Sequence, residues 1–135
     1  MLAARDLALI SIALLALHAP AFPRKGETGF LNRTVRVGGT TYRYQVYVPA
    51  EWSKGKKWPV ILFLHGAGER GDDGLIQTEV GIGSAVRRHP ERVPAVVVLP
   101  QCRKEKWWTF PEMEAQAIAA LDESTREFHG DPARV

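Results

Sequence analysis

The sequence predicts an α/β fold in which an antiparallel hairpin precedes parallel strands joined by crossover helices. Three features predict it: adjacent glycines at Gly38 and Gly39 between two strand-like runs, two wholly apolar runs at 60–64 and 95–99, and an amphipathic helical pattern near the C-terminus. The 135 residues, 45% hydrophobic and 24% charged, suit one globular domain.

The first residues differ in composition from the rest. Residues 7–17 form an apolar run too short for a comfortable membrane span, and the small residues Ala19, Pro20 and Ala21 follow it. We expect residues 1–21 to be a secretory signal peptide, with an uncleaved anchor or a buried helix as alternatives. Residues 22–31 then form a linker and residues 32–135 a partial domain. The predicted location is secreted or periplasmic, without stable membrane association after signal cleavage.

The predicted hairpin joins residues 34–37 to residues 41–48. Two adjacent glycines suit a tight turn because glycine accepts positive φ. In the second run, apolar side chains at even positions alternate with Arg43 and Gln45. This period of two predicts a half-exposed antiparallel pair.

The apolar runs at 60–64 and 95–99 are typical of parallel strands covered on both faces. Between them, residues 72–83 read as loop, followed by a short helix at 84–89 that Pro90 stops. A second helix is expected to start at a capping box, Thr109 to Glu112, and to end at Gly130. Its predicted sheet-facing residues are Ile118, Leu121, Thr125 and Phe128.

Residues 131–135 read as a turn leading into another strand. A hairpin and two buried strands leave an unpaired sheet edge, which is an aggregation hazard. We therefore expect the chain to be the N-terminal part of a longer protein.

Cysteine content and charge narrow the function classes. Cys102 is the only cysteine, so a site of paired cysteines is excluded and a buried thiol is expected. The net charge is +3, but the basic residues fall into short separate groups, which gives no support for nucleic-acid binding. No metal or organic cofactor is expected.

Glycines spaced G-x-G-x-x-G, at Gly66, Gly68 and Gly71, directly follow the first apolar run. A dinucleotide site would need a helix opening at Gly71 and an acidic residue ending the next strand, and that strand ends instead at Pro100 and Gln101. The other interpretation is a turn that presents a backbone N–H to an oxyanion. Glycine would allow a sharp bend and close substrate approach there. Ala67 is the first candidate donor and Gly68 the second.

The chain from residue 32 onward resembles the α/β-hydrolase superfamily, and most of all secreted prolyl-oligopeptidase-like serine hydrolases described as predicted peptidases or carboxylesterases. The resemblance rests on three stretches: residues 62–71 (LFLHGAGERG), residues 99–102 (LPQC) with Trp107 and Trp108, and residues 131–135 (DPARV). It implies cleavage of a carboxylic ester or a peptide bond through a serine acyl-enzyme, with the ester slightly favoured.

In that family, the nucleophile elbow G-x-S-x-G and then the triad aspartate and histidine lie further along the chain. None of these can be assigned to residues 1–135, so we expect these residues to be inactive alone. Ser84 lies in no such motif and stands at the start of a predicted helix, where no strand precedes it.

The remaining site predictions surround the glycine turn. We expect His65, Gly66, Glu69 and Arg70 to support the loop, His65 through bonds to nearby backbone. Gln101, Trp107 and Trp108 follow a strand's carboxyl end and could border the cleft, although packing against the next helix is the simpler role for the tryptophans. The alternative function is a non-catalytic protein that binds a cell-wall polymer or carbohydrate.

Overall fold

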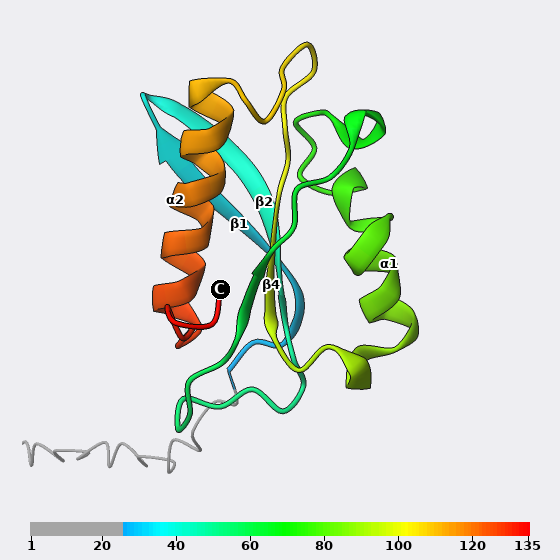
Figure 1. The fold of residues 1–135 in the computed structure, drawn as a ribbon, viewed down its shortest axis with the longest axis vertical. Helices are drawn as coiled ribbons and strands as arrows, with labels where there is room; N and C mark the ends of the chain where they lie inside the picture. The colour runs from blue at the N-terminus through cyan, green and yellow to red at the C-terminus, as the bar shows by residue number, and fades with distance from the viewer. Residues whose placement is uncertain (1–25) are drawn as a thin grey trace, which may run out of the picture.

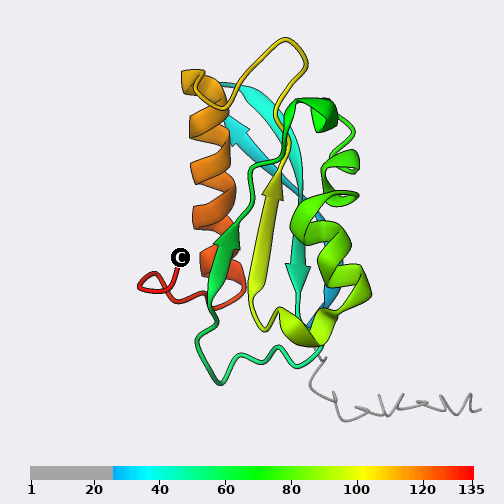
Figure 2. The same cartoon turned by 45° about the vertical axis from the view of Figure 1, so that its right-hand side comes forward.

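The computed structural model describes residues 26–135, which form one four-stranded sheet with a helix on each face (Figure 1). The strands are β1 (Gly29–Val37), β2 (Thr40–Val48), β3 (Val60–Leu62) and β4 (Val96–Pro100), in the spatial order β1-β2-β4-β3. The helices are α1 (Gly81–Arg88) and α2 (Pro111–Glu127). Figure 2 shows the strands of the sheet standing between α2 on the left and α1 on the right. The predicted signal peptide, 1–21, lies outside the described residues.

The hairpin of β1 and β2 has the predicted turn, with Gly38 at φ 54° and Gly39 at φ 81°. Two corrections apply. β1 begins at Gly29, so the end of the predicted linker is strand. The pair is also less exposed than predicted, because the second face of β2 is covered as well: Gln45 and Tyr47 are both buried.

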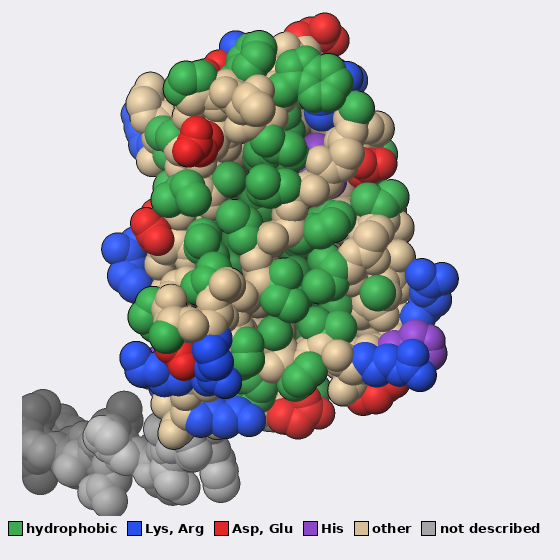
Figure 3. All heavy atoms as spheres, in the orientation of Figure 1, with side chains coloured by type: hydrophobic (Ala, Val, Ile, Leu, Met, Phe, Trp, Pro, Cys, Tyr) green, Lys and Arg blue, Asp and Glu red, His purple; other side chains and the backbone are tan. Residues whose placement is uncertain are grey.

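β3 and β4 pair in parallel, as predicted. All five residues of β4 are buried, but β3 is short and lies at the sheet edge. Ile61 is 36% exposed and Leu64 is 44% exposed, so the prediction that residues 60–64 are covered on both faces is wrong for β3. Figure 3, in the orientation of Figure 1, shows hydrophobic side chains gathered along the middle of the visible face.

α1 begins at Gly81, earlier than the predicted residue 84. Gly81 has φ 54°, and a side chain at Gly83 would place its Cβ 2.2 Å from the backbone oxygen of Thr78. Glycine is therefore required where α1 meets the loop before it. The sequence prediction took these glycines for loop because glycine disfavours helix interiors.

The predicted start, face and end of α2 all need correction. Its N-cap is Phe110 and no side chain caps it, so Thr109 and Glu112 form no capping box; Glu112 pairs with Lys106 at 2.7 Å instead. The helix ends at Glu127, and His129, at φ 54°, takes the left-handed position expected for Gly130.

The buried face of α2 consists of small or flexible side chains, while Ile118 is 47% exposed. These buried residues are Met113, Gln116, Ala117, Ala120 and Ser124. Ser124 Oγ donates to Tyr44 Oη, so a large side chain of the sheet meets a small one of the helix. The predicted face is therefore right in part: Phe128 is buried and Leu121 packs against the core, but Ile118 is exposed because Tyr44 of the sheet fills much of the space at this interface.

The segment after α2 returns to the open edge of β3. Gly130 forms a parallel bridge with Trp58, and Val60 N–H donates to the Arg134 carbonyl at 3.0 Å. The predicted turn is present, and the Asp131 carboxylate stabilises it by accepting a hydrogen bond from Ala133 N–H. Residues 131–135 contain no strand. Neither helix in the described part of the chain has the length and apolarity needed to cross a membrane.

Candidate functional site

The glycine loop, residues 65–71, leaves the carboxyl end of β3 and includes a 3₁₀ helix at Ala67–Glu69. Three hydrogen bonds join it to the chain that leaves the parallel neighbour β4. Cys102 N–H donates to His65 Nε2 (2.9 Å), Gly71 N–H donates to the Cys102 carbonyl (2.8 Å) and Trp108 Nε1–H donates to the His65 carbonyl (2.9 Å). The carboxyl ends of adjacent parallel strands are where α/β folds place ligands.

His65 is the buried anchor of this loop, with its side chain fully shielded from solvent. Because Nε2 accepts from Cys102 N–H, the ring proton sits on Nδ1, which donates to the Gly66 carbonyl at 2.6 Å. Burial lowers the pKa of His65, so the ring is neutral and its 3.9 Å approach to Glu69 is not an ion pair near pH 7. The Trp108 ring packs edge-on against it, 5.1 Å between centroids.

Ala67 and Gly68 are exposed at the start of the 3₁₀ helix. The first N–H groups of a helix have no partner within it. Within residues 26–135, no hydrogen bond from Ala67 N–H to another residue is present. A backbone donor at Ala67 is therefore unpaired at the loop surface.

The backbone of the loop bends less than the sequence prediction assumed. Gly66 has φ −81° and ψ −171°, an extended conformation open to any residue, and neither Gly66 nor Gly68 has positive φ. A side chain on Gly68 would meet nothing within 4 Å, whereas one on Gly71 would approach Gln101 Nε2 to 2.9 Å. Glycine at position 68 leaves open space beside the loop for a ligand to approach. Glycine at position 71 is explained by close packing against Gln101.

Arg70 holds the loop from its outer side. Its Nε donates to the Ala67 carbonyl at 3.0 Å and its Nη1 donates to the Lys106 carbonyl at 3.3 Å. The guanidinium also lies over the Trp107 ring, 4.5 Å from the centroid. These contacts tie Ala67 to the tryptophan segment.

A small hollow of about 100 Å³ adjoins the loop, and we call it the loop hollow. Its walls include Ala67, Arg70, Trp107 and Trp108, together with His65, Gly66, Cys102 and Lys106. Trp107 is 53% exposed, so an indole face is open to solvent beside Ala67. Cys102 is buried, and burial raises the pKa of its thiol.

Gln101, which was expected to border the cleft, does not line the loop hollow. It is buried, its Nε2 donates to the Glu69 carbonyl and to Asp73 Oδ1, and its Oε1 accepts from Gly74 N–H at 2.7 Å. Its side-chain amide therefore connects the glycine loop, through Glu69, to the segment that follows it, through Asp73 and Gly74. The sequence did not predict this role of Gln101 or the backbone hydrogen bonds of Cys102, because no sequence motif indicates either of them.

Two other interpretations of the residues find no support in the geometry. No helix opens at Gly71, as a dinucleotide site requires. Ser84 Oγ bonds to the Gly81 carbonyl and Ser124 Oγ to Tyr44, so neither is paired with a histidine. Among residues 26–135, no three His, Cys, Asp or Glu side chains gather as metal ligands would.

Comparison with known proteins finds similarity among solved structures. No protein-family model matches the sequence, and no curated protein matches it. Among solved structures, the chain is similar to one described as a thermostable esterase, with 27% identity and a TM-score of 0.65 over 76% of this chain. The match covers 31% of the esterase chain. The fold is thus α/β and corresponds to the N-terminal part of an α/β-hydrolase fold, a hairpin followed by parallel strands.

Proposed function

We propose that this chain is the N-terminal portion of an exported serine hydrolase and contributes the oxyanion-hole loop. The whole protein would cleave a carboxylic ester or a peptide bond through an acyl-enzyme. The similarity to an esterase supports a hydrolase-like function at a coarse level and favours the ester. Export is proposed from the pattern of residues 1–21 alone.

The observation that carries the proposal is the unpaired N–H of Ala67 on a braced loop at the carboxyl end of β3. A tetrahedral intermediate places negative charge on the former carbonyl oxygen, and a fixed backbone donor stabilises that charge without reorganising. His65, Arg70 and Gly71 are the residues that would keep the donor fixed. Gly68 N–H is the second candidate donor.

The loop hollow would receive the part of the substrate next to the scissile bond. Trp107 and Trp108 would both line the substrate site, Trp107 with an exposed indole face. The hydrogen bond from Trp108 Nε1–H to the His65 carbonyl holds Trp108 in a fixed position relative to the loop. The nucleophile, the triad aspartate and the triad histidine would come from residues downstream of Val135. No cofactor is part of this chemistry.

The test is to express the full-length protein and treat it with a fluorophosphonate, which labels activated serines. We expect one labelled serine, in a G-x-S-x-G sequence downstream of Val135, and no labelling of residues 1–135 alone. A folded full-length protein that is not labelled would instead favour the binding-protein alternative. Labelling within residues 1–135 would overturn the assignment of the nucleophile.

A further inference from the structure

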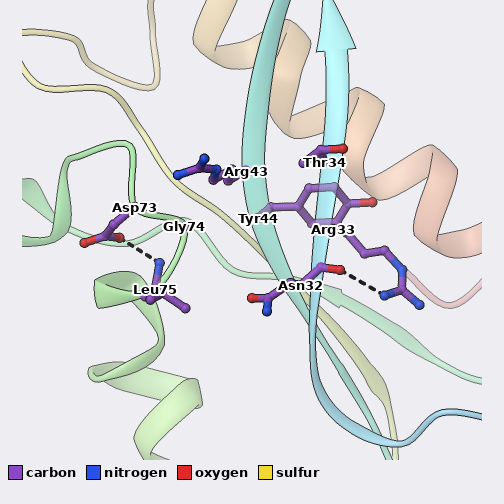
Figure 4. A pocket seen from close by; sticks show the side chains of 8 residues that line it. All are labelled: Asn32, Arg33, Thr34, Arg43, Tyr44, Asp73, Gly74 and Leu75. Atoms are coloured by element: carbon purple, nitrogen blue, oxygen red, sulfur yellow. Dashed lines mark hydrogen bonds between the residues drawn. The ribbon is translucent and has the colours of Figure 1, made fainter.

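A second, larger cavity lies against the hairpin, and we call it the hairpin pocket (Figure 4). It has a volume of about 530 Å³. The hairpin contributes Asn32, Arg33, Thr34, Arg43 and Tyr44 to its lining, and the loop after Gly71 contributes Asp73, Gly74 and Leu75. Cavities that hold small ligands commonly measure about 300–1,000 Å³. It shares no lining residue with the loop hollow.

The loop wall of the hairpin pocket is fixed against β2. Gly74 has φ 69°, and a Cβ there would lie 2.7 Å from Arg43 Cβ, so the loop rests directly on the Arg43 stem. Gln45 Nε2 donates to the Gly74 carbonyl at 3.1 Å and Gly74 N–H donates to Gln101 Oε1 at 2.7 Å. The pocket is therefore already formed without a ligand.

Two opposite charges line this pocket without pairing with each other. Arg43 is exposed, and its guanidinium makes no hydrogen bond or ion pair with any residue in the 26–135 range. Asp73 Oδ1 accepts from the N–H groups of Leu75 (2.7 Å) and Ile76 (3.2 Å), which leaves Oδ2 open. The Leu75 bond is the main cause that lowers the pKa of Asp73, so the carboxylate is ionised.

The remaining cation of the pocket is already neutralised. Arg33 pairs with Glu27 at 3.0 Å and with Glu127 at 2.7 Å. Arg43 and Asp73 thus decide which ligand fits, and their charges cancel. A group that carries a single charge would be attracted by one of these side chains and repelled by the other, so neither a lone anion nor a lone ammonium group gains net attraction from the pair.

A hydroxyl group both donates and accepts, so it satisfies a carboxylate and a guanidinium alike. Thr34 adds a hydroxyl that can also do both, and Asn32 adds amide donors, because its Oδ1 already accepts from Gln45 Nε2. Leu75, which is 54% exposed, offers an apolar surface to ring C–H groups. From this combination of groups we propose that the hairpin pocket binds a neutral sugar ring. The proposal does not depend on the hydrolase chemistry.

The experiment titrates the full-length protein with neutral oligosaccharides of glucose, xylose, mannose, galactose and N-acetylglucosamine, with inorganic phosphate and lysine as charged probes. Chemical-shift changes at Asn32, Arg43 and Leu75 report binding at the pocket. We expect at least one neutral saccharide to bind there, with an affinity that stays constant between low and high salt. Charged probes should bind more weakly.

Variants locate the contact. Arg43→Met and Asp73→Asn should each weaken saccharide binding by about tenfold, since each loses a hydrogen bond to a charged group. Arg36→Met is the matched control, because Arg36 lies on the same face of the hairpin but outside the pocket, and it should leave the affinity unchanged. Phosphate binding that weakens with salt, no saccharide binding, or equal effects of the Arg43 and Arg36 variants would each overturn the proposal.

Discussion

His65 stands where β3 gives way to the glycine loop, and both of its ring nitrogens are used inside the protein. The sequence suggested that its imidazole would bond nearby backbone, and the bond to Gly66 is local in that sense. The second bond, to Cys102, joins residues 37 positions apart. Sequence reasoning could not find that partner because a backbone N–H has no residue-type signature.

His65 should make stability depend on pH in the acid direction. Its folded pKa is lowered from the ordinary 6.5, so the folded protein resists protonation and the unfolded chain does not. The stabilisation is complete above about pH 6.5 and falls below it, by at most about 1.4 kcal/mol per pH unit. Urea unfolding at pH 7.5 and pH 5.5 should show His65→Gln costing less stability at the lower pH. An equal cost at both pH values would contradict this.

Ala67 offers a direct test of the backbone donor. Ala67→Pro removes the N–H, while Gly66 is already extended and proline is accepted at a first helical position, so the loop should keep its shape. In the full-length protein we expect kcat for an activated ester to fall by about 10²–10³. Ala67→Gly, which retains the N–H, should act as wild type. Equal kcat for the two variants would remove Ala67 from the oxyanion hole.

The helices and strands differ in how well their sequence patterns predicted them. The hairpin was predictable because Gly38 and Gly39 leave few other options for the turn. The face of α2 was predictable only in part: Phe128 is buried as predicted, but Ala117 and Ala120 are buried while the larger Ile118 is exposed. Side-chain size indicates a buried face only when the partner surface is flat, and here Tyr44 of β2 fills the space.

α1 supplies a test at the scale of an element. Gly83→Ala would improve helix propensity by about 1 kcal/mol, but the added Cβ would strike the Thr78 backbone, and such overpacking costs about 1–3 kcal/mol. We expect a net loss of stability in urea unfolding. Ser84→Ala, one position on, should stay within about 0.5 kcal/mol of wild type. A stabilised Gly83→Ala variant would show that α1 does not pack on that turn.

Across the whole molecule, the parallel pairing of β3 with β4 places the glycine loop and the end of β4 side by side at the carboxyl end of these two strands. The fold class could be predicted from the sequence because a hairpin and two apolar runs allow few arrangements. The exposed position of β3 could not, because the apolar run at 60–64 is the same for a central strand and for an edge strand. Ile61 and Leu64 were misjudged for that reason.

The whole molecule also separates two surfaces with different proposed roles. The loop hollow, with Ala67 and Trp107, belongs to the proposed chemistry, and the hairpin pocket, with Arg43 and Asp73, to the proposed sugar site. Gln101 lies between them, bonded to Glu69 of one loop segment and to Gly74 of the other. Each role can fail without the other.

The most direct measurement is the crystal structure of the full-length protein after reaction with a fluorophosphonate. In the phosphonylated serine, the free phosphonyl oxygen on phosphorus mimics the oxyanion, and we expect it about 2.7–3.1 Å from Ala67 N. A phosphonyl oxygen held by other donors, with Ala67 N–H facing solvent or another protein group, would contradict the account.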